Sequence, residues 1–449
     1  MATLADPARH SMVELDELLG ASGVLGSDQV GDYAIGPFVP MAAARPADTQ
    51  EVSLVLEWAH RNNVAIYPVG GGTLKHLGNP PTRPGIALDM SRLNGMLDFQ
   101  PADLTVHVQA GMTVEDLDSA LAQDAKYVPL APPLPGRATV GGTLATGISG
   151  PLRSTYGLPR DWLIGMTVVG PDGTISKCGG QVVKNVTGYD LNRLYTGSLG
   201  TLAVITDATF KITPAPIAWA AVVAAFENNQ SAVSACHDLL AQPYAPHALH
   251  LLNPDAVRHL DVGQLPTGYG PAALAVVAGR PASVKRRTED IALAWLGSAS
   301  TLRIEGGEAI QLTESLADFP VNPIHPTSLC IRINAQPSAL EQLMAMETTE
   351  IAGAHPAILA DAGFGGGRLI WWNDVSQEDP VQLAQHLRDI QADAVASGGS
   401  AIVETCPPET KALVDVWGPD PSGMDIMRRI KRQFDPRGVL NPGRFVGGL

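Results

Sequence analysis

Three glycine-rich stretches are the part of this sequence best suited to chemistry. They occupy residues 69–73, 138–147 and 197–201, and the first follows a short apolar run. Consecutive glycines let the backbone adopt positive φ and point successive N–H groups into one concavity, which can bind a pyrophosphate without local positive charge. A single glycine triplet is more typical of a turn after a strand. Three such stretches in one chain favour a long, bent, anionic ligand.

The cysteines and histidines form no pattern of metal ligands. The four cysteines, at positions 178, 236, 330 and 406, are too far apart for a CxxC pair or an iron–sulfur ligand run. His247 and His250 have the spacing of one helical face, but such a pair without a nearby carboxylate is more typical of packing than of metal binding. If electrons pass onward to an iron–sulfur cluster, we expect that cluster on another chain.

The composition indicates a folded protein with two or three lobes. The chain has 449 residues, of which 45% are hydrophobic and 17% are charged. The net charge of −15 disfavours binding to nucleic acid or anionic lipid. There is no apolar run of about 18 residues, and residues 1–10 lack the hydrophobic segment of a signal peptide. We therefore expect no transmembrane segment and a cytoplasmic location.

Short strands and helices alternate in the part of the chain that must position the glycine stretches. We expect helices over residues 13–28, from Asp48 or Thr49 through Ala59, and from Thr113 onward, strands at 65–69, 86–88 and 104–109, and a hairpin over 164–178. This α+β pattern ends near the prolines at 214 and 216.

The remainder of the chain predicts a second domain and a fixed tail. Residues 217–423 are rich in alanine, and their alternating helix-like and strand-like runs predict an antiparallel sheet covered on one face. The glycines at 363–367 precede a strand and indicate a turn or bulge rather than a phosphate loop. A basic helix is predicted over 424–434, followed by a turn-rich tail whose prolines and glycines fix its path. These features divide the chain into 1–36, 37–216, 217–423 and 424–449.

Taken together, these motifs resemble the vanillyl-alcohol-oxidase family of FAD proteins, whose FAD-binding domain is of the PCMH type. The resemblance is carried by the first two glycine stretches, by residues 183–190 and 197–207, and by the closing segment 434–445. Residues 184–190 and the stretch from Trp417 to Phe445 are most similar to the flavin-binding E subunits of bacterial glycolate oxidases. The motifs cover the first domain and the tail but not residues 217–423.

The resemblance implies a fold and a set of FAD-binding residues. The fold is α+β, with a two-lobed PCMH-type FAD-binding domain, an α+β cap domain, and a C-terminal segment that returns to the FAD. The residues implied at the pyrophosphate are Val69, Gly70, Gly71, Gly72, Thr73, Thr139, Gly141, Gly142, Thr143, Ala145, Thr146 and Gly147. The adenine and ribose side is implied for Gly200, Val204 and Ile205, and the flavin ring for Asn441, Arg444, Arg153, Tyr156 and Gly157. A surface ion pair is the alternative role of Arg153.

Two departures from the family pattern change what is expected. Covalent members link FAD through a histidine directly after the first glycines or a cysteine in the second stretch, whereas Thr73 occupies the first place and residues 138–147 contain no cysteine. His76 lies three residues too late, so we expect non-covalent FAD.

The catalytic subunits of related enzymes use a Glu-His-Gly segment to bind a metal and deprotonate a 2-hydroxy acid. The nearest match here, residues 404–407, has no histidine, so the sequence identifies no catalytic residue and no metal ligand.

Three functions remain open from the sequence. The first is an FAD subunit of a glycolate or related 2-hydroxy-acid oxidase complex, which relays electrons from a catalytic flavoprotein subunit to an iron–sulfur subunit as glycolate becomes glyoxylate. The second is a self-sufficient D-2-hydroxy-acid dehydrogenase with His325 or His355 as its base. The third is a scaffold with a vestigial flavin site, which the retained glycine stretches disfavour. We expect the first, in the cytoplasm, with any contact to the inner membrane made through the partner subunits.

Overall fold

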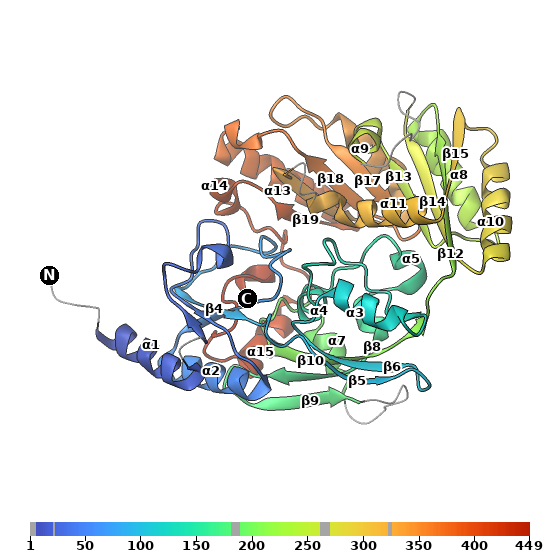
Figure 1. The fold of residues 1–449 in the computed structure, drawn as a ribbon. Helices are drawn as coiled ribbons and strands as arrows, with labels where there is room; N and C mark the ends of the chain where they lie inside the picture. Colours follow the sequence, from blue (N-terminus) through green and yellow to red (C-terminus); the bar gives the residue numbers. More distant parts are fainter. Residues whose placement is uncertain (1–5, 21–22, 181–188, 261–269, 322–325) are drawn as a thin grey trace.

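The computed structural model describes residues 6–20, 23–180, 189–260, 270–321 and 326–449. Its first lobe is built on two main sheets (Figure 1), beside a two-stranded one that β7 (Lys126–Tyr127) and β11 (Thr213–Pro214) form. The smaller sheet has the strand order β1 (Val24–Leu25), β2 (Ala43–Ala44), β4 (Gly85–Asp89) and β3 (Ala65–Val69). Helix α2 (Thr49–Asn62) packs on it and begins as predicted, because the Asp48 side chain accepts a hydrogen bond from the Glu51 amide. The helix predicted over 13–28 is wrong at its end. Helix α1 (Asp6–Leu19) stops before Gly20, whose φ is +72°, and strand β1 follows.

The larger sheet of the first lobe is entirely antiparallel. Its order is β5 (Met96–Gln100), β6 (Thr105–Gln109), β10 (Val204–Lys211), β8 (Leu163–Val169) and β9 (Ile175–Gly179). The predicted hairpin is confirmed as β8 and β9. Helices α3 (Val114–Ala122) and α4 (Val140–Thr146) pack against this sheet, and each begins at a threonine whose hydroxyl accepts an amide hydrogen bond. Shorter elements complete the lobe: β7 (Lys126–Tyr127), α5 (Arg153–Tyr156), α6 (Pro159–Trp162), α7 (Leu191–Tyr195) and β11 (Thr213–Pro214).

The second lobe, which we call the cap, is built on one eight-stranded antiparallel sheet above the first lobe in Figure 1. Its order is β15 (Ser300–Glu305), β12 (Ala218–Ala225), β14 (Ala272–Gly279), β13 (Ala248–Leu252), β17 (Ala357–Asp361), β18 (Gly367–Trp371), β16 (Leu329–Asn334) and β19 (Ser400–Thr405).

Helices cover both faces of the cap sheet, so the prediction of a sheet covered on one face is wrong. One face packs against α8 (Asn229–Leu240), α10 (Pro281–Ala294), α12 (Leu340–Ala345) and α13 (Pro380–Ala396). The other packs against α9 (Pro254–His259) and α11 (Gly307–Asp318). The reason is visible in β12, β13 and β14, which are nearly unbroken runs of buried alanine, valine and leucine. Strands of this kind are buried on both faces.

The C-terminal segment returns to the first lobe. Helix α15 (Met424–Phe434) has the predicted bounds, and Ile430 and Phe434 pack on the core of the larger sheet. The tail then lies parallel to β3, because the Ile66 amide donates to the Val439 carbonyl at 2.8 Å and the Asn441 amide donates to the Ile66 carbonyl at 2.9 Å. The α+β fold with a returning C-terminal segment is therefore confirmed, while the four domain boundaries stay predictions. No helix in the described part of the chain is both long and apolar enough to span a membrane.

Candidate functional site

The first glycine stretch leaves β3 and packs closely against the approach to α4. A Cβ atom on Gly70 would lie 2.1 Å from the Thr139 hydroxyl oxygen, and one on Gly71 would lie 1.5 Å from the Arg137 carbonyl oxygen. Gly72 has φ of +68°, which side-chain-bearing residues rarely adopt. The three glycines are therefore needed for the fold, before any ligand is considered, because they allow the loop to pack directly against the segment that leads into α4.

The amide groups of this loop are free to bind a ligand. Within the described residues, the N–H groups of residues 70–74 donate no hydrogen bond to the protein. All five residues are partly exposed, and all five line a groove beside α4. A row of unsatisfied amides on one loop is a binding surface for anionic oxygens.

The second stretch forms the start of α4 and the facing wall of the groove. Gly141 touches Ala110, because a Cβ atom on it would lie 2.8 Å from the Ala110 Cβ. Gly142 is different. A Cβ atom there would meet only the Thr139 hydroxyl, at 3.1 Å, so the remaining space belongs to the groove. Gly147 ends the helix with φ of +64° and acts as a C-cap.

The tail supplies a buried cation to the same groove. Arg444 is 5% exposed and donates through Nη2 to the carbonyl oxygens of Lys75 (2.9 Å) and Leu77, while its buried Nη1 has no partner among the described residues. Burial lowers the pKa of Arg444 to about 10, so the group is still charged at neutral pH. Asn441 donates through Nδ2 to the Leu199 carbonyl at 2.5 Å. Both side chains line the groove.

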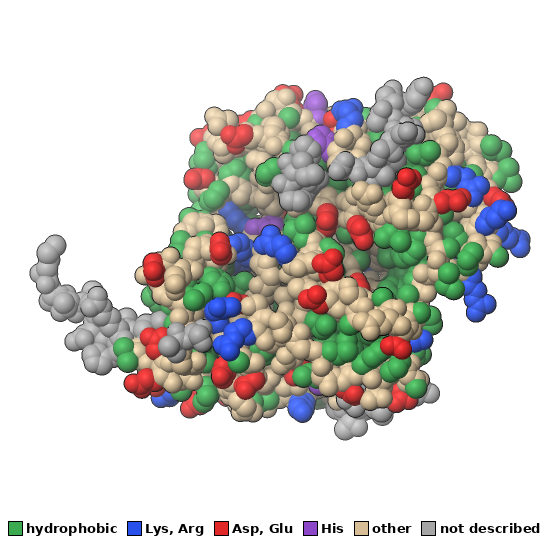
Figure 2. Space-filling model, viewed as in Figure 1, with side chains coloured by type: hydrophobic (Ala, Val, Ile, Leu, Met, Phe, Trp, Pro, Cys, Tyr) green, Lys and Arg blue, Asp and Glu red, His purple; other side chains and the backbone are tan. Residues whose placement is uncertain are grey.

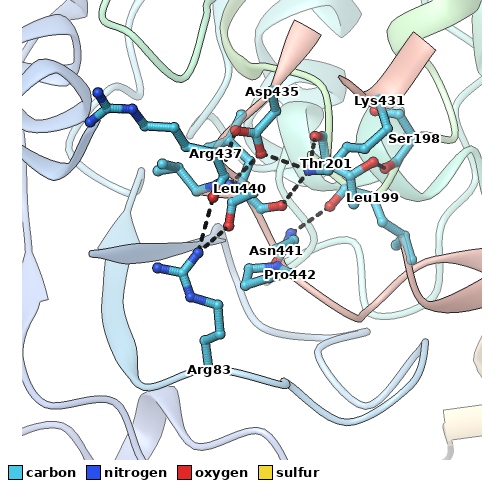
Figure 3. Close-up of polar contacts among 12 residues, drawn as sticks. Arg83, Ser198, Leu199, Thr201, Lys431, Asp435, Arg437, Leu440, Asn441 and Pro442 are labelled. Atoms are coloured by element: carbon cyan, nitrogen blue, oxygen red, sulfur yellow. Dashed lines mark hydrogen bonds and ion pairs between the residues drawn. The ribbon is translucent and has the colours of Figure 1, made fainter. Parts of the chain in front are cut away.

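A buried ion pair holds the tail in this position (Figure 3). Lys431 Nζ donates to Asp435 Oδ2 at 2.7 Å, to the Thr201 carbonyl at 2.7 Å and to the Leu440 carbonyl at 3.0 Å. The Asp435 carboxylate also accepts from the amides of Val439 and Leu440 at 2.9 Å. This pair connects α15, the third glycine stretch and the tail. It was not expected from the sequence.

The groove has two connected parts that together contain most of the FAD-binding residues implied by the resemblance. The first part is lined by Val69, Gly70, Gly71, Gly72, Thr73, Thr139, Gly142, Thr143, Ala145, Thr146, Asn441 and Arg444, together with Ile148 and Leu199. The second part shares Val69, Gly70, Thr139, Gly142 and Ala145 and adds Gly141, Gly200, Val204 and Ile205. Gly147, Tyr156 and Gly157 line neither part. Their proposed contacts, like those of the other residues, stay predictions.

Arg153 lies in a separate cavity beneath the cap, which we call the arginine cavity. It adjoins the groove, because Ile148 lines both. The Arg153 guanidinium carbon lies 3.6 Å from the centroid of the Phe364 ring. Arg332 and Arg368 from the cap sheet line the same cavity. Figure 2 shows Lys and Arg side chains on the left of the boundary between the two lobes, whereas α5, which carries Arg153, lies on the right in the same view (Figure 1).

Glu404 is the carboxylate paired with two of these arginines. It accepts from Arg368 Nε at 2.7 Å and lies 3.1 Å from Arg332 Nε. Burial alone would raise the pKa of Glu404, but the Arg368 and Arg332 guanidinium groups outweigh burial and lower it to about 2. Glu404 is therefore an ionised, paired carboxylate at neutral pH and is unsuited to act as a base.

Neither histidine named as a candidate base is among the described residues that line this cavity. His355 is exposed and does not line it, and His325 lies outside the described residues, as does most of the motif at 183–190. The cavity contains His250 instead, which is 4% exposed on strand β13, with Nε2 3.2 Å from the Pro151 carbonyl and Nδ1 without a partner among the described residues. The helical spacing read for His247 and His250 is wrong, because residues 248–252 form a strand. No group of three metal-ligating side chains occurs in the described part of the chain.

The chemistry of the groove fits FAD. It offers free amides for a pyrophosphate, glycine surfaces for close approach, apolar walls from Ile148 and Leu199, and an incompletely satisfied cation in Arg444. The fold and groove define an FAD-dependent oxidoreductase with a PCMH-type FAD-binding domain.

Comparison with known proteins gives the family. The FAD binding domain family matches residues 40–179, and the C-terminal domain of FAD linked oxidases matches residues 418–445. The glycolate oxidase subunit GlcD of Bacillus subtilis is 30% identical over 420 residues, which is 91% of this chain and 89% of that protein. A D-lactate dehydrogenase of Anaerostipes hadrus is 29% identical, with 97% of each chain covered. The chain belongs to the FAD-linked oxidase family, and its cofactor is FAD.

Solved structures support the fold. The chain resembles p-cresol methylhydroxylase with substrate bound, with a TM-score of 0.74 and 16% identity over 99% of this chain and 97% of that one. An alkyldihydroxyacetonephosphate synthase gives a TM-score of 0.73 at 16% identity, covering 96% and 84% of the two chains. The Bacillus subtilis relative is a D subunit, whereas the sequence motifs favour an E subunit. The subunit type therefore stays a prediction.

Proposed function

We propose that this chain is the FAD-carrying subunit of a 2-hydroxy-acid oxidase complex of the glycolate oxidase type. In this complex it relays electrons from a catalytic flavoprotein subunit toward an iron–sulfur subunit as glycolate is oxidised to glyoxylate. The observation that carries the proposal is a groove suited to FAD beside a cavity whose carboxylate, Glu404, is neutralised by arginines. The glycolate oxidase and D-lactate dehydrogenase relatives support the substrate class.

The residues of the groove have separable tasks in this proposal. When bound, FAD supplies the two-electron chemistry. The amides of residues 70–74 and the surface of Gly142 would hold the pyrophosphate, while Asn441 and Arg444 close the groove from the tail. Ile148 and Leu199 exclude water from its walls.

A self-sufficient D-2-hydroxy-acid dehydrogenase is the second candidate, and the arginine cavity favours it. Three guanidinium groups next to a flavin groove can bind the carboxylate of a hydroxy acid directly. An FAD that only relays electrons between protein subunits does not need such a cavity.

Activity with and without partners separates the two candidates. We expect the purified, FAD-loaded chain to oxidise glycolate or D-lactate about a hundredfold or more slowly than the assembled complex, because proton abstraction by a positioned base contributes about that much. The measurement is dye-linked turnover with the chain alone and with the catalytic and iron–sulfur subunits added. Rapid bleaching of the flavin by glycolate without partners would favour the self-sufficient enzyme.

Acid denaturation tests how FAD is held. We expect all flavin to appear in the supernatant after precipitation of the chain with acid. The reason is that no described residue lining the groove is a histidine, cysteine or tyrosine, and Thr73 occupies the place of the linking histidine. Absorbance of supernatant and pellet measures the two fractions, and a flavin-coloured pellet would contradict non-covalent binding.

A further inference from the structure

A cavity separate from the groove lies between α7, the third glycine stretch and α15, and we call it the α7–α15 cavity. Its volume is about 230 Å³, and it shares no lining residue with either part of the groove or with the arginine cavity. An apolar cavity of about 150 Å³ can bind benzene, so this one has room for a ligand of one or two rings. Its apolar walls are formed by Leu194, Leu202, Met427, Ile430, Phe445 and Leu449.

One hydroxyl group in this cavity has no partner among the described residues. Ser198 lines the cavity and is 5% exposed, but its hydroxyl forms no hydrogen bond with a described residue. The hydroxyls of Thr196 and Thr201 are already used, since they donate to the carbonyl oxygens of Asn192 at 2.8 Å and Ser198 at 2.7 Å. The Ser198 hydroxyl is therefore the polar group that remains available to a ligand.

The two cations that line the cavity are already paired. Lys431 donates to Asp435 and to two carbonyl oxygens (Figure 3), and Arg193 Nε lies 3.1 Å from Asp190 Oδ2. Among the described lining residues, no ionisable side chain lacks an ion-pair partner. An ion that entered the cavity would lose hydration without gaining a partner. The cavity therefore favours an uncharged ligand.

The third glycine stretch connects this cavity to the FAD groove. Gly197, Ser198 and Thr201 line the cavity, whereas Leu199 and Gly200 line the groove. Leu199 has φ of +51°, which side-chain-bearing residues rarely adopt and which surrounding contacts must maintain. A ligand in the cavity adds such contacts from the side of Ser198 and Thr201, so it stabilises the conformation of the stretch on which the groove depends.

We propose that the α7–α15 cavity is an effector site for a compact, uncharged, largely apolar molecule with one hydrogen-bonding group, and that its occupant strengthens FAD binding. The apolar walls supply most of the affinity, and the Ser198 hydroxyl fixes the orientation of the ligand. FAD and the effector require the same conformation of residues 197–201, which gives positive coupling between the two sites. The site does not depend on the proposed function, because both candidate functions use FAD.

Titration of the FAD-loaded chain with 2-naphthol, naphthalene and 2-naphthoate tests the site, with the heat of binding as the readout. FAD occupies the groove throughout. We expect 2-naphthol and naphthalene to bind, and we expect 2-naphthoate not to displace 2-naphthol. Ser198→Ala should weaken binding of 2-naphthol by about two- to tenfold, the usual contribution of one uncharged hydrogen bond, and should leave binding of naphthalene unchanged.

Two tryptophan variants of α15 form a matched pair. Met427 lines the cavity, and the larger side chain of Met427→Trp would fill it, so we expect no binding of 2-naphthol. Ile426 is 54% exposed and does not line the cavity, so Ile426→Trp should bind like the wild type. Equal binding by the two variants, or no heat of binding with the wild-type chain, would overturn the assignment.

The rate at which FAD leaves the loaded chain tests the coupling. Flavin fluorescence after dilution follows this rate, and we expect saturating 2-naphthol to slow it about fivefold or more in the wild type but not in Met427→Trp. An unchanged rate would disprove the coupling. A faster rate would show that 2-naphthol enters the groove, which would also refute the effector site. If 2-naphthol acts as expected but the assembled complex does not oxidise glycolate, the proposed function falls and the effector site stands.

Discussion

Gly142→Val is expected to remove FAD from the chain while leaving the protein folded. Gly142 lines both parts of the groove, and a side chain there would extend into the space that the pyrophosphate requires. Steric overlap in a packed site costs about 1–3 kcal/mol, which corresponds to a loss of about ten- to a hundredfold in affinity. Flavin absorbance per polypeptide after gel filtration, and the Kd for added FAD, measure the effect.

The control for this variant is Gly307→Val. Gly307 is also helical, in the first turn of α11, and a Cβ atom on it would have no neighbour within 4 Å. We expect this variant to keep its FAD. Gly71→Val would be a poor choice, because its side chain would collide with the Arg137 carbonyl and disturb the protein itself. Normal FAD content in Gly142→Val would mean that the groove is wrongly assigned.

Lys431→Met is expected to have the largest effect on stability. It leaves the Asp435 carboxylate fully buried with only the amides of Val439 and Leu440 as partners. Breaking a buried ion pair in this way costs about 3–5 kcal/mol. FAD affinity should fall as well, because the tail that carries Asn441 and Arg444 loses its attachment to Thr201. Denaturant unfolding and FAD titration measure the two consequences.

Two comparisons show whether the charge is responsible. Lys431→Met combined with Asp435→Asn removes both charges and should recover part of the lost stability, which a double-mutant cycle quantifies. Arg428→Met breaks the exposed pair of Arg428 with Asp420, whose side chains are 45% and 48% exposed, and should cost less than about 1 kcal/mol. An unfolding free energy of Lys431→Met equal to that of the wild type would contradict the role given to the buried pair.

The groove could be anticipated from the sequence because its determinants are local. A glycine that must approach another backbone, or adopt positive φ, is visible as a glycine in a short stretch, as at residues 70–72. The caps of α2 and α3 are equally local, since each threonine or aspartate bonds an amide three residues later. The family resemblance joined these stretches into one site.

The arginine cavity could not be anticipated because its determinants are long-range. Arg332 and Arg368 meet only through the register of β16 and β18, and Arg153 comes from the other lobe. The pattern of residues 217–423 predicts strands but not their order or register. The location of His250 was not predicted for a related reason. Its spacing from His247 suggested a helix, because a strand that is buried on both faces has no alternating polar pattern to identify it.

The path of the tail has a consequence for how the protein matures. Asn441 bonds a carbonyl that precedes it by 242 residues, and Lys431 bonds one that precedes it by 230. During translation the amino-terminal lobe leaves the ribosome first and begins to fold before the later parts exist. The groove at that moment lacks Asn441 and Arg444, and the complete cap must be synthesised before they arrive. We therefore expect stable cofactor uptake to follow release of residues 431–444 from the ribosome, so that newly made chains pass through an apoprotein stage.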